Sequence, residues 1–326
     1  MRWLRWPAMA ASIDVVIVAH NRYELTESCL RHLAAQSVAH QVILVDNGSS
    51  DDSAARVAEH WPAVQLVAFE DGRGFAEACN RGVSAGTGAV VVVLNNDVDC
   101  EPDFLEQLTA PLDADPQLGS VAALLLQPGG QTIDSVGLVA DVALACFPRL
   151  QGRGVGEARA QRPALTGPAG AGAAYRRAAW EEVGGMDEAI FAYMEDFDLA
   201  LRLRSAGWGT VAATDARGIH LGSASHGHRS ASQRRHGGFG RGYVLRRYGV
   251  LRSRAGARAL TTEVVVVLGD LVISRDVAAI RGRLEGWRAA RHATRLPAPP
   301  PQAIDARITF RDSLALRRGV YGSRAA

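Results

Sequence analysis

The chain has 326 residues, 48% of them hydrophobic and 21% charged, which is typical of a folded globular protein and not of a disordered or fibrous one. This length allows one large α/β domain with an appendage, or two ordinary domains. No apolar run reaches the ~18 to 20 residues of a membrane-spanning helix, and the best candidate, 264–273, contains Asp270. The segment 1–12 is too short and too interrupted for a signal peptide to be expected.

Charge is distributed unevenly, although the net charge is only +2. Residues 1–216 contain 15 arginines and 28 acidic residues, a balance of −13, whereas residues 217–326 contain 21 arginines and 6 acidic residues, a balance of +15. This split predicts an anionic partner for the C-terminal third, unless the two parts neutralise one another across an interface. The tail has few aromatic residues to stack on bases, so we expect an anionic membrane surface and no nucleic acid.

Cysteine spacing indicates the cellular compartment. The four cysteines are scattered, with no C-x-x-C pair and no zinc-site spacing: Cys29, Cys79, Cys100 and Cys146. This usage favours a reduced, cytoplasmic location. Together with the basic tail, it leads us to expect a protein peripherally associated with the inner face of the plasma membrane.

Apolar runs alternate with helical patterns along the first third of the chain. The predicted strands are 13–22, 41–46, 64–70 and 90–94, and the predicted helices between them are 24–36, 52–61 and 74–86. The last of these strands is a continuous apolar run, as expected when both faces of a strand are covered. Repeated alternation of this kind predicts an α/β fold with a mostly parallel central sheet and helices on its faces.

The pattern loosens after residue 110. Segment 167–188 is predicted to end a loop and start a helix, and 195–207 is an amphipathic helix that stops at Gly207. A proline-rich linker follows at 296–302. We therefore expect three parts: an N-terminal extension at 1–11, a main domain at 12–245, and a basic helical C-terminal extension at 246–326.

Two glycine patterns suggest a dinucleotide-binding fold but do not complete its fingerprint. They are GRGFAE at 72–77 and GAGAAY at 170–175. The G-x-G-x-x-G fingerprint belongs in the first turn between a strand and a helix, and neither segment lies there. We reject both as cofactor signals.

Acidic residues follow two of the predicted strands. Asp46 ends the second strand and Asp97 follows the fourth. Ligands of open α/β sheets bind at the carboxyl ends of the strands, so the two side chains are expected to share a cleft. Either could instead be a solvated turn residue. Similarly, Glu195 and Asp196 open a predicted helix, where they could serve only as favourable charges at its positive end.

The order of these motifs resembles the family-two glycosyltransferases, and within them the branch of bacterial rhamnosyl- and galactofuranosyl-transferases of cell-envelope glycans. The resemblance covers about 13–250 and is carried by IDVVIVAHNR, VILVDNGSSDDS, GRGFAEACNRG, VVVVLNNDVDCEPDFL, GGMDEAIFAYMEDFDLALRLRSAGW and IHLGSAS. It implies a GT-A fold, a nucleotide-sugar donor, a divalent metal and inversion at the anomeric carbon.

The resemblance also assigns roles to individual residues. Asp46 corresponds to the aspartate that binds the pyrimidine base, Asp97 to a metal ligand in the D-x-D site, and Asp196 to the catalytic base, with Glu195 beside it. His220 corresponds to a histidine that completes the metal site in some members, and Asp99 is a weaker metal candidate. The remaining expected donor-binding residues are Ala19, His20, Asn21, Arg22, Arg73, Gly74, Asn80, Asn95 and Asn96. The sequence departs from the family at Asn95, the first D-x-D position, and at Gly72, where the family usually has asparagine.

These residue types fit metal-assisted sugar transfer. Mg²⁺ and Mn²⁺ bind oxygen ligands and bridge phosphates, and a histidine ligand favours Mn²⁺. A carboxylate can take the proton of an attacking hydroxyl. We expect a dTDP- or UDP-linked donor and a glycan or polyprenyl-diphosphate-linked acceptor. The alternatives are a nucleotidyltransferase and a non-catalytic nucleotide-sugar binding protein.

Overall fold

The computed structural model describes residues 13–222 and 230–317, and its centre is a curled mixed sheet. The sheet has the strand order β3-β2-β1-β4-β10-β6-β11-β5, with β7 paired to β6, and a separate pair is formed by β8 and β9. The strands are β1 (Ile13–Ala19), β2 (Gln41–Asn47), β3 (Gln65–Phe69), β4 (Val90–Asn95), β5 (Val98–Cys100), β6 (Leu118–Leu126), β7 (Ile133–Ser135), β8 (Leu138–Ala140), β9 (Cys146–Pro148), β10 (Gly172–Arg176) and β11 (Gly209–His220).

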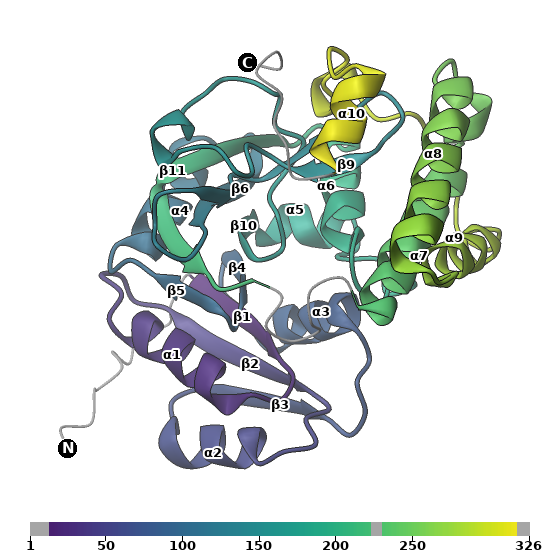
Figure 1. Ribbon diagram of the computed structural model, residues 1–326. Coiled ribbons are helices and arrows are strands. Elements are labelled where there is room, and N and C mark those ends of the chain that lie inside the picture. Colours follow the sequence, from purple (N-terminus) through teal and green to yellow (C-terminus); the bar gives the residue numbers. More distant parts are fainter. Residues whose placement is uncertain (1–12, 223–229, 318–326) are drawn as a thin grey trace.

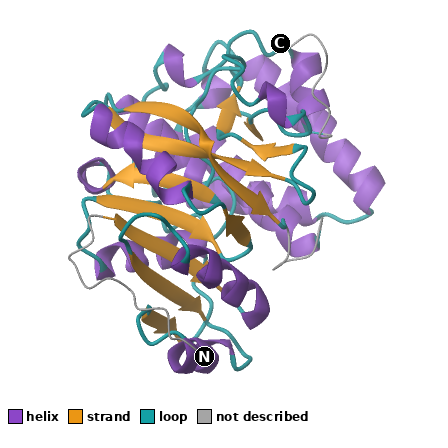
Figure 2. Ribbon diagram, turned by 90° about the vertical axis from the view of Figure 1, so that its left-hand side faces the viewer, coloured by secondary structure: helices purple, strands orange, loops and turns teal. Residues whose placement is uncertain are grey.

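Helices cover both faces of this sheet, and the last ones gather on one side of it (Figures 1 and 2). The helices are α1 (Tyr23–Ala34), α2 (Ser53–His60), α3 (Phe75–Ala85), α4 (Phe104–Ala114), α5 (Arg177–Glu182), α6 (Glu195–Ser205), α7 (Ala231–Arg247), α8 (Gly256–Ser274), α9 (Ala278–Ala289) and α10 (Phe310–Leu316). The described residues also form short 3-10 helices, η1 (Val155–Glu157), η2 (Val250–Arg252) and η3 (Pro301–Ala303). No helix in the described ranges is long and apolar enough to cross a membrane.

The first four predicted strands form the parallel half of the sheet. β1 pairs in parallel with both β2 and β4, and β3 extends the row beside β2. Alternate residues of β4 enter two different cores: Val92 and Leu94 pack in the cluster that includes α1, and Val91 and Val93 pack in the cluster that includes α3. The continuous apolar run of β4 therefore reflects burial on both faces, as the sequence predicts.

The other half of the sheet departs from the parallel pattern. β10 lies antiparallel between β4 and β6, in a segment expected as a loop that leads to a helix. The helix, α5, is present, but the strand before it was missed because its residues are small. Gly172 and Ala173 give no recognisable apolar alternation. In the structure this strand is closely packed, since a Cβ at Gly172 would lie only 3.1 Å from the Leu125 side chain. The close packing of the sheet explains why these residues are small.

The C-terminal helices pack against the sheet domain and against one another. α7 and α9 approach closely through glycines on both helices, since a Cβ at Gly238 would lie 2.5 Å from the Ala279 carbonyl oxygen. Further along the chain, Thr166 Oγ1 donates to the carbonyl of Ala303 at 2.7 Å, and the Ala164 N–H donates to Asp305 at 2.9 Å. The expected boundary at residue 245 falls within α7, and the division into a domain and an extension stays a prediction.

Candidate active site

The loops after β1 and β2 are joined by short polar side chains. Asp46 pairs with Ala19 across the two strands, so the ends of both strands lie side by side. Asp46 is buried and accepts hydrogen bonds from the hydroxyl and the N–H of Ser49, and the same hydroxyl accepts from the Asn21 N–H at 2.7 Å. Asn21 and Arg22 both have positive φ, 57° and 59°, which turns the chain sharply into α1. The structure thus brings Asp46 together with the predicted loop 19–22.

Arg73 and Gly74, which are also expected to bind the donor, lie beside the same loops. The Arg73 N–H donates to Asn47 Oδ1 at 2.8 Å, and His20 Nδ1 lies 3.1 Å from the Asn47 carbonyl. Gly74 has a φ of +90°, and a Cβ there would lie 2.6 Å from the Phe191 carbonyl oxygen, so only glycine fits. Asn47 was not predicted as a site residue, although it follows Asp46 directly at the carboxyl end of β2.

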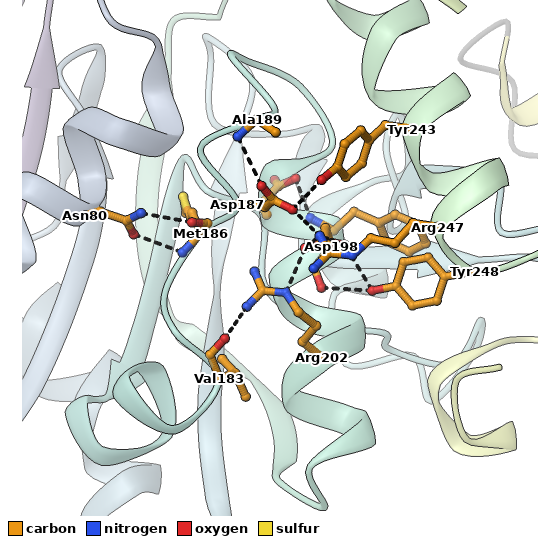
Figure 3. A network of polar contacts seen from close by, with 12 residues as sticks. Asn80, Val183, Met186, Asp187, Ala189, Asp198, Arg202, Tyr243, Arg247 and Tyr248 are labelled. Carbon is orange, nitrogen blue, oxygen red and sulfur yellow. Dashed lines mark hydrogen bonds and ion pairs between the residues drawn. The ribbon is translucent and has the colours of Figure 1, made fainter. Parts of the chain in front are cut away.

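Asn80 serves to position a loop. Its amide donates to the Met186 carbonyl at 2.9 Å and accepts from the Met186 N–H at 2.9 Å (Figure 3). It also donates to Glu188 at 2.9 Å. The side chain joins α3 to the segment that leads into α6, and a direct contact between Asn80 and a donor stays a prediction.

The end of β4 carries the predicted metal-binding residues. Asn96 is buried and donates to Thr26 Oγ1 at 3.0 Å, while Asn95 is half-buried. Asp97 is buried, and its Oδ1 accepts no well-aligned hydrogen bond from a described residue. His220 Nε2 lies 3.3 Å from that oxygen. Asp97 and His220, 123 positions apart in the sequence, therefore lie side by side, and their role as metal ligands stays a prediction.

A third residue, Asp134 on β7, holds the histidine ring. Its Oδ2 lies 2.8 Å from His220 Nδ1. Burial disfavours a charged ring, but the hydrogen bond to Asp134 and the contact with Asp97 outweigh it and raise the pKa of His220 to about 9. Asp134 is 86 positions from His220, and no sequence pattern singled it out.

Asp99 occupies a different environment from Asp97. It lies on β5 and accepts a hydrogen bond from Ser28 Oγ at 2.8 Å, with His32 Nε2 3.7 Å away. Both of these partners belong to α1. Asp99 is therefore engaged by side chains of α1, whereas Asp97 keeps a buried oxygen without such a bond.

The donor set at Asp97 fits a divalent cation. Within 13–222 and 230–317 no group of three or more His, Cys, Asp or Glu side chains is arranged to hold a metal ion. However, a buried carboxylate oxygen without a hydrogen bond faces an imidazole nitrogen whose ring is oriented by a second carboxylate. Carboxylate and imidazole ligands supported in this way are common in metal sites, and Mg²⁺ or Mn²⁺ bound with phosphates requires few protein ligands.

Glu195 and Asp196 lie at the first turn of α6. Asp196 is half-buried and accepts from the Gly170 N–H at 2.9 Å; burial raises its pKa, and the backbone donors oppose that rise in part. Glu195 is buried, its Oε2 has no hydrogen-bond partner in the described structure, and burial together with the neighbouring Asp196 charge raises its pKa well above the usual range. Of the two carboxylates, Asp196 is the more exposed.

A buried network fixes the position of α6 (Figure 3). Asp198 is fully buried and accepts from Arg202 Nε at 2.7 Å, from the Tyr248 hydroxyl at 3.0 Å and from Arg247 at 3.3 Å. Arg247 also pairs with Asp187, in the loop that precedes α6. Asp198 and Arg202 thus have a structural role, because their contacts tie the helix that begins with Glu195 and Asp196 to the end of α7.

Comparisons with known families agree with this geometry. Residues 14–184 match the family Glycosyl transferase family 2, and residues 100–277 match Glycosyl transferase family group 2. The chain belongs to glycosyl transferase family 2. This glycosyltransferase is 29% identical, over 67% of its length and 80% of the relative, to an N-acetylglucosaminyl-diphospho-decaprenol L-rhamnosyltransferase of Mycobacterium tuberculosis. It is 27% identical to the O-antigen biosynthesis protein RfbC of Myxococcus xanthus, over 68% of this chain and 18% of that protein.

Solved structures confirm the GT-A fold that the resemblance implies. The mannosyltransferase PcManGT of Pyrobaculum calidifontis, in complex with GDP-Man and Mn²⁺, matches with a TM-score of 0.56 at 19% identity. The match covers 96% of this chain and 86% of the mannosyltransferase chain. GalNAc-T7 with UDP, GalNAc and Mn²⁺ matches with a TM-score of 0.57 at 15% identity, over 74% of this chain and 49% of the GalNAc-T7 chain. At these identities the likeness shows the fold alone.

Proposed function

We propose that this glycosyltransferase moves a sugar, rhamnose or a similar one, from a dTDP- or UDP-linked donor to a hydroxyl of a glycan or polyprenyl-diphosphate-linked acceptor in cell-envelope polysaccharide synthesis. The observation that carries the proposal is the placement of Asp97 with His220, while Asp196 lies at the first turn of α6. The Mycobacterium tuberculosis relative, named for a decaprenol-linked acceptor and L-rhamnose, supports the choice of substrates.

The ends of β1 and β2 form the expected base-binding site. A carboxylate at Asp46 can accept the imide N–H that uracil and thymine share. Ser49 holds this carboxylate in place through its N–H and hydroxyl, so its orientation is fixed before a nucleotide binds. Ala19, His20, Asn21 and Arg22 border the same site, and the backbone at Arg73 and Gly74 joins it through Asn47.

Asp97 and His220 would hold Mn²⁺ or Mg²⁺, and the ion would displace the proton that the raised pKa keeps on the His220 ring. Such an ion neutralises negative charge on the leaving nucleoside diphosphate. Asp134 keeps the histidine ring oriented through Nδ1, which leaves Nε2 directed at Asp97. The Mn²⁺ in both solved relatives supports this assignment.

Asp196 would take the proton from the acceptor hydroxyl as that oxygen attacks the anomeric carbon. A single displacement of this kind inverts the configuration there and needs no protein nucleophile. Burial raises the pKa of Asp196, which makes its carboxylate a better base near neutral pH. The Gly170 N–H holds one carboxylate oxygen in position.

Product analysis with the full chain tests the proposal. We would incubate it with dTDP-rhamnose or UDP-sugars, Mn²⁺ and a polyprenyl-diphosphate-linked N-acetylglucosamine, and identify the released nucleotide. Transfer releases a nucleoside diphosphate, whereas a nucleotidyltransferase would release or consume pyrophosphate. A non-catalytic binding protein would bind the donor without forming product, and either result would overturn the proposal.

A further inference from the structure

Helix α8 exposes a continuous apolar stripe. Leu260, Val264, Leu268 and Val272 recur every four residues and therefore lie along one side of the helix. Their exposed fractions are 57%, 50%, 56% and 75%, and the adjacent Ile273 is 77% exposed. No described residue covers this side, and large apolar surfaces left open in this way commonly mark a binding site.

The opposite side of α8 is anchored by buried charges, so the stripe has a fixed direction. Glu263 is buried and pairs with Arg241 at 2.7 Å and with Arg283 at 2.9 Å. One turn earlier, Arg258 pairs with Asp141 at 3.0 Å. These pairs join α8 to α7, α9 and the segment after β8. They prevent the helix from rotating its apolar side inward.

The surface that surrounds the stripe is positively charged. Every acidic side chain between 250 and 292 is ion-paired: Glu263, Asp270, Asp276 and Glu285 all contact arginines. Arg252 and Arg254 precede α8, Arg275 follows it, and all three are exposed without a carboxylate partner among the described residues. The stripe is therefore bordered at both ends by free cations.

We propose that the outer side of α8 docks on an anionic lipid bilayer, with its apolar side chains in the interfacial layer and the flanking arginines on lipid phosphates. Apolar side chains along one side of a helix can enter a membrane interface, and nearby basic side chains are attracted to anionic lipids. The inference deepens the proposed function and rests on its lipid-linked acceptor, because docking places the enzyme on the surface that carries such an acceptor.

A cavity beside the start of α8 suits the same partner. It has a volume of about 240 Å³ and includes Arg246, Arg252 and Arg295 among its lining residues, together with Leu245, Leu251 and Trp287. None of the described residues that line it is acidic. Arg246 is held by the Trp287 carbonyl at 3.0 Å. Three guanidinium groups beside apolar side chains match a lipid phosphate with its attached chains.

Vesicle flotation with the full chain tests the docking surface. The wild type should float with phosphatidylcholine vesicles that contain phosphatidylglycerol, and less with phosphatidylcholine alone. The double variant Leu268→Glu/Val272→Glu should bind at least about ten-fold less, since charges in the apolar side oppose interfacial burial. The matched control, Ala55→Glu/Ala58→Glu, adds the same charges to the exposed side of α2 and should bind like wild type. Equal binding by the α8 variant and the control would overturn the proposal.

Two further measurements separate the competing explanations. Light scattering should find the wild type monomeric. If the wild type formed a dimer and Leu268→Glu/Val272→Glu did not, the stripe would be a contact between two copies of the chain, which would overturn lipid docking. Thermal shift with UDP or dTDP and Mn²⁺ should be unchanged in the α8 variant. If the wild type itself gave no such shift, the proposed function would fail while the flotation result would stand independently.

Discussion

The two halves of the site are held together in different ways. Around Asp46, short side chains such as Asn21 and Ser49 bind nearby backbone groups in the loops after β1 and β2. Around Asp97 and α6, partners come from distant segments: Asp134 with His220, and Asp198 with Arg247. The proposed base-binding half is thus built from short polar side chains of two neighbouring loops, and the proposed catalytic half from charged side chains of several elements.

The largest effect is expected at Asp97, on which the metal proposal depends. Asp97→Ala should abolish metal-dependent binding of the nucleoside diphosphate. The loss of affinity should exceed the ~10- to 100-fold that is typical when a residue orienting a metal ligand is removed. Calorimetry with UDP or dTDP, with and without Mn²⁺, measures it. Asp99→Ala is the matched control and should be milder, because Asp99 is already engaged by Ser28. Equal losses at both positions would show that the metal-binding position is wrongly assigned to Asp97.

Asp196 separates chemistry from binding in the same half. Asp196→Asn keeps the shape of the side chain and can still accept from Gly170, but an amide cannot take a proton at neutral pH. The kcat for transfer should fall by roughly 10²- to 10⁴-fold, with little change in donor Kd.

Glu195→Gln serves as the neighbouring control for Asp196. It should cost less, since Glu195 is buried and its raised pKa favours the neutral form. If Glu195→Gln proved the more damaging, the base would be the other carboxylate. If Asp196→Asn weakened donor binding as much as turnover, Asp196 would be a ligand and not the base.

The Asp198 network tests whether long-range charge supports the catalytic half. Asp198→Ala removes a fully buried carboxylate and leaves Arg202 and Arg247 without it, which should lower the free energy of unfolding by about 3–5 kcal/mol. Urea denaturation measures the change. Asp215→Ala breaks the exposed pair with Arg159 and should cost at most about 1 kcal/mol. Similar costs for the two variants would mean that the buried network stabilises the fold no more than an exposed ion pair does.

The sequence predicted the features that depend on local pattern. The strands of the parallel half, the turn at Asp46 and the helix at 195–207 follow from apolar periodicity and capping, and the first strands and this helix are present as expected. The pairing of Asp97 with His220 came from the family resemblance, not from the spacing of the two residues. β10 was missed because its small residues have no period, and Asp134 because partners far apart in the chain leave no local signal.

Asp134 gives the smallest expected effect and the sharpest test of the comparison. Asp134→Asn can still accept from His220 Nδ1 but loses the charge that makes the ring a stronger ligand. Mn²⁺ affinity, measured by electron paramagnetic resonance in the presence of UDP or dTDP, should fall by roughly 10-fold, and by more in Asp134→Ala. Asp215→Asn, on β11 and exposed, is the matched control and should bind Mn²⁺ like wild type.

An unchanged Mn²⁺ affinity in Asp134→Asn would mean that the His220 ring needs no second carboxylate. A fall in kcat at intact Mn²⁺ affinity would instead place Asp134 with the acceptor. The expected loss would show that the catalytic half depends on a residue 86 positions away from the ligand it orients.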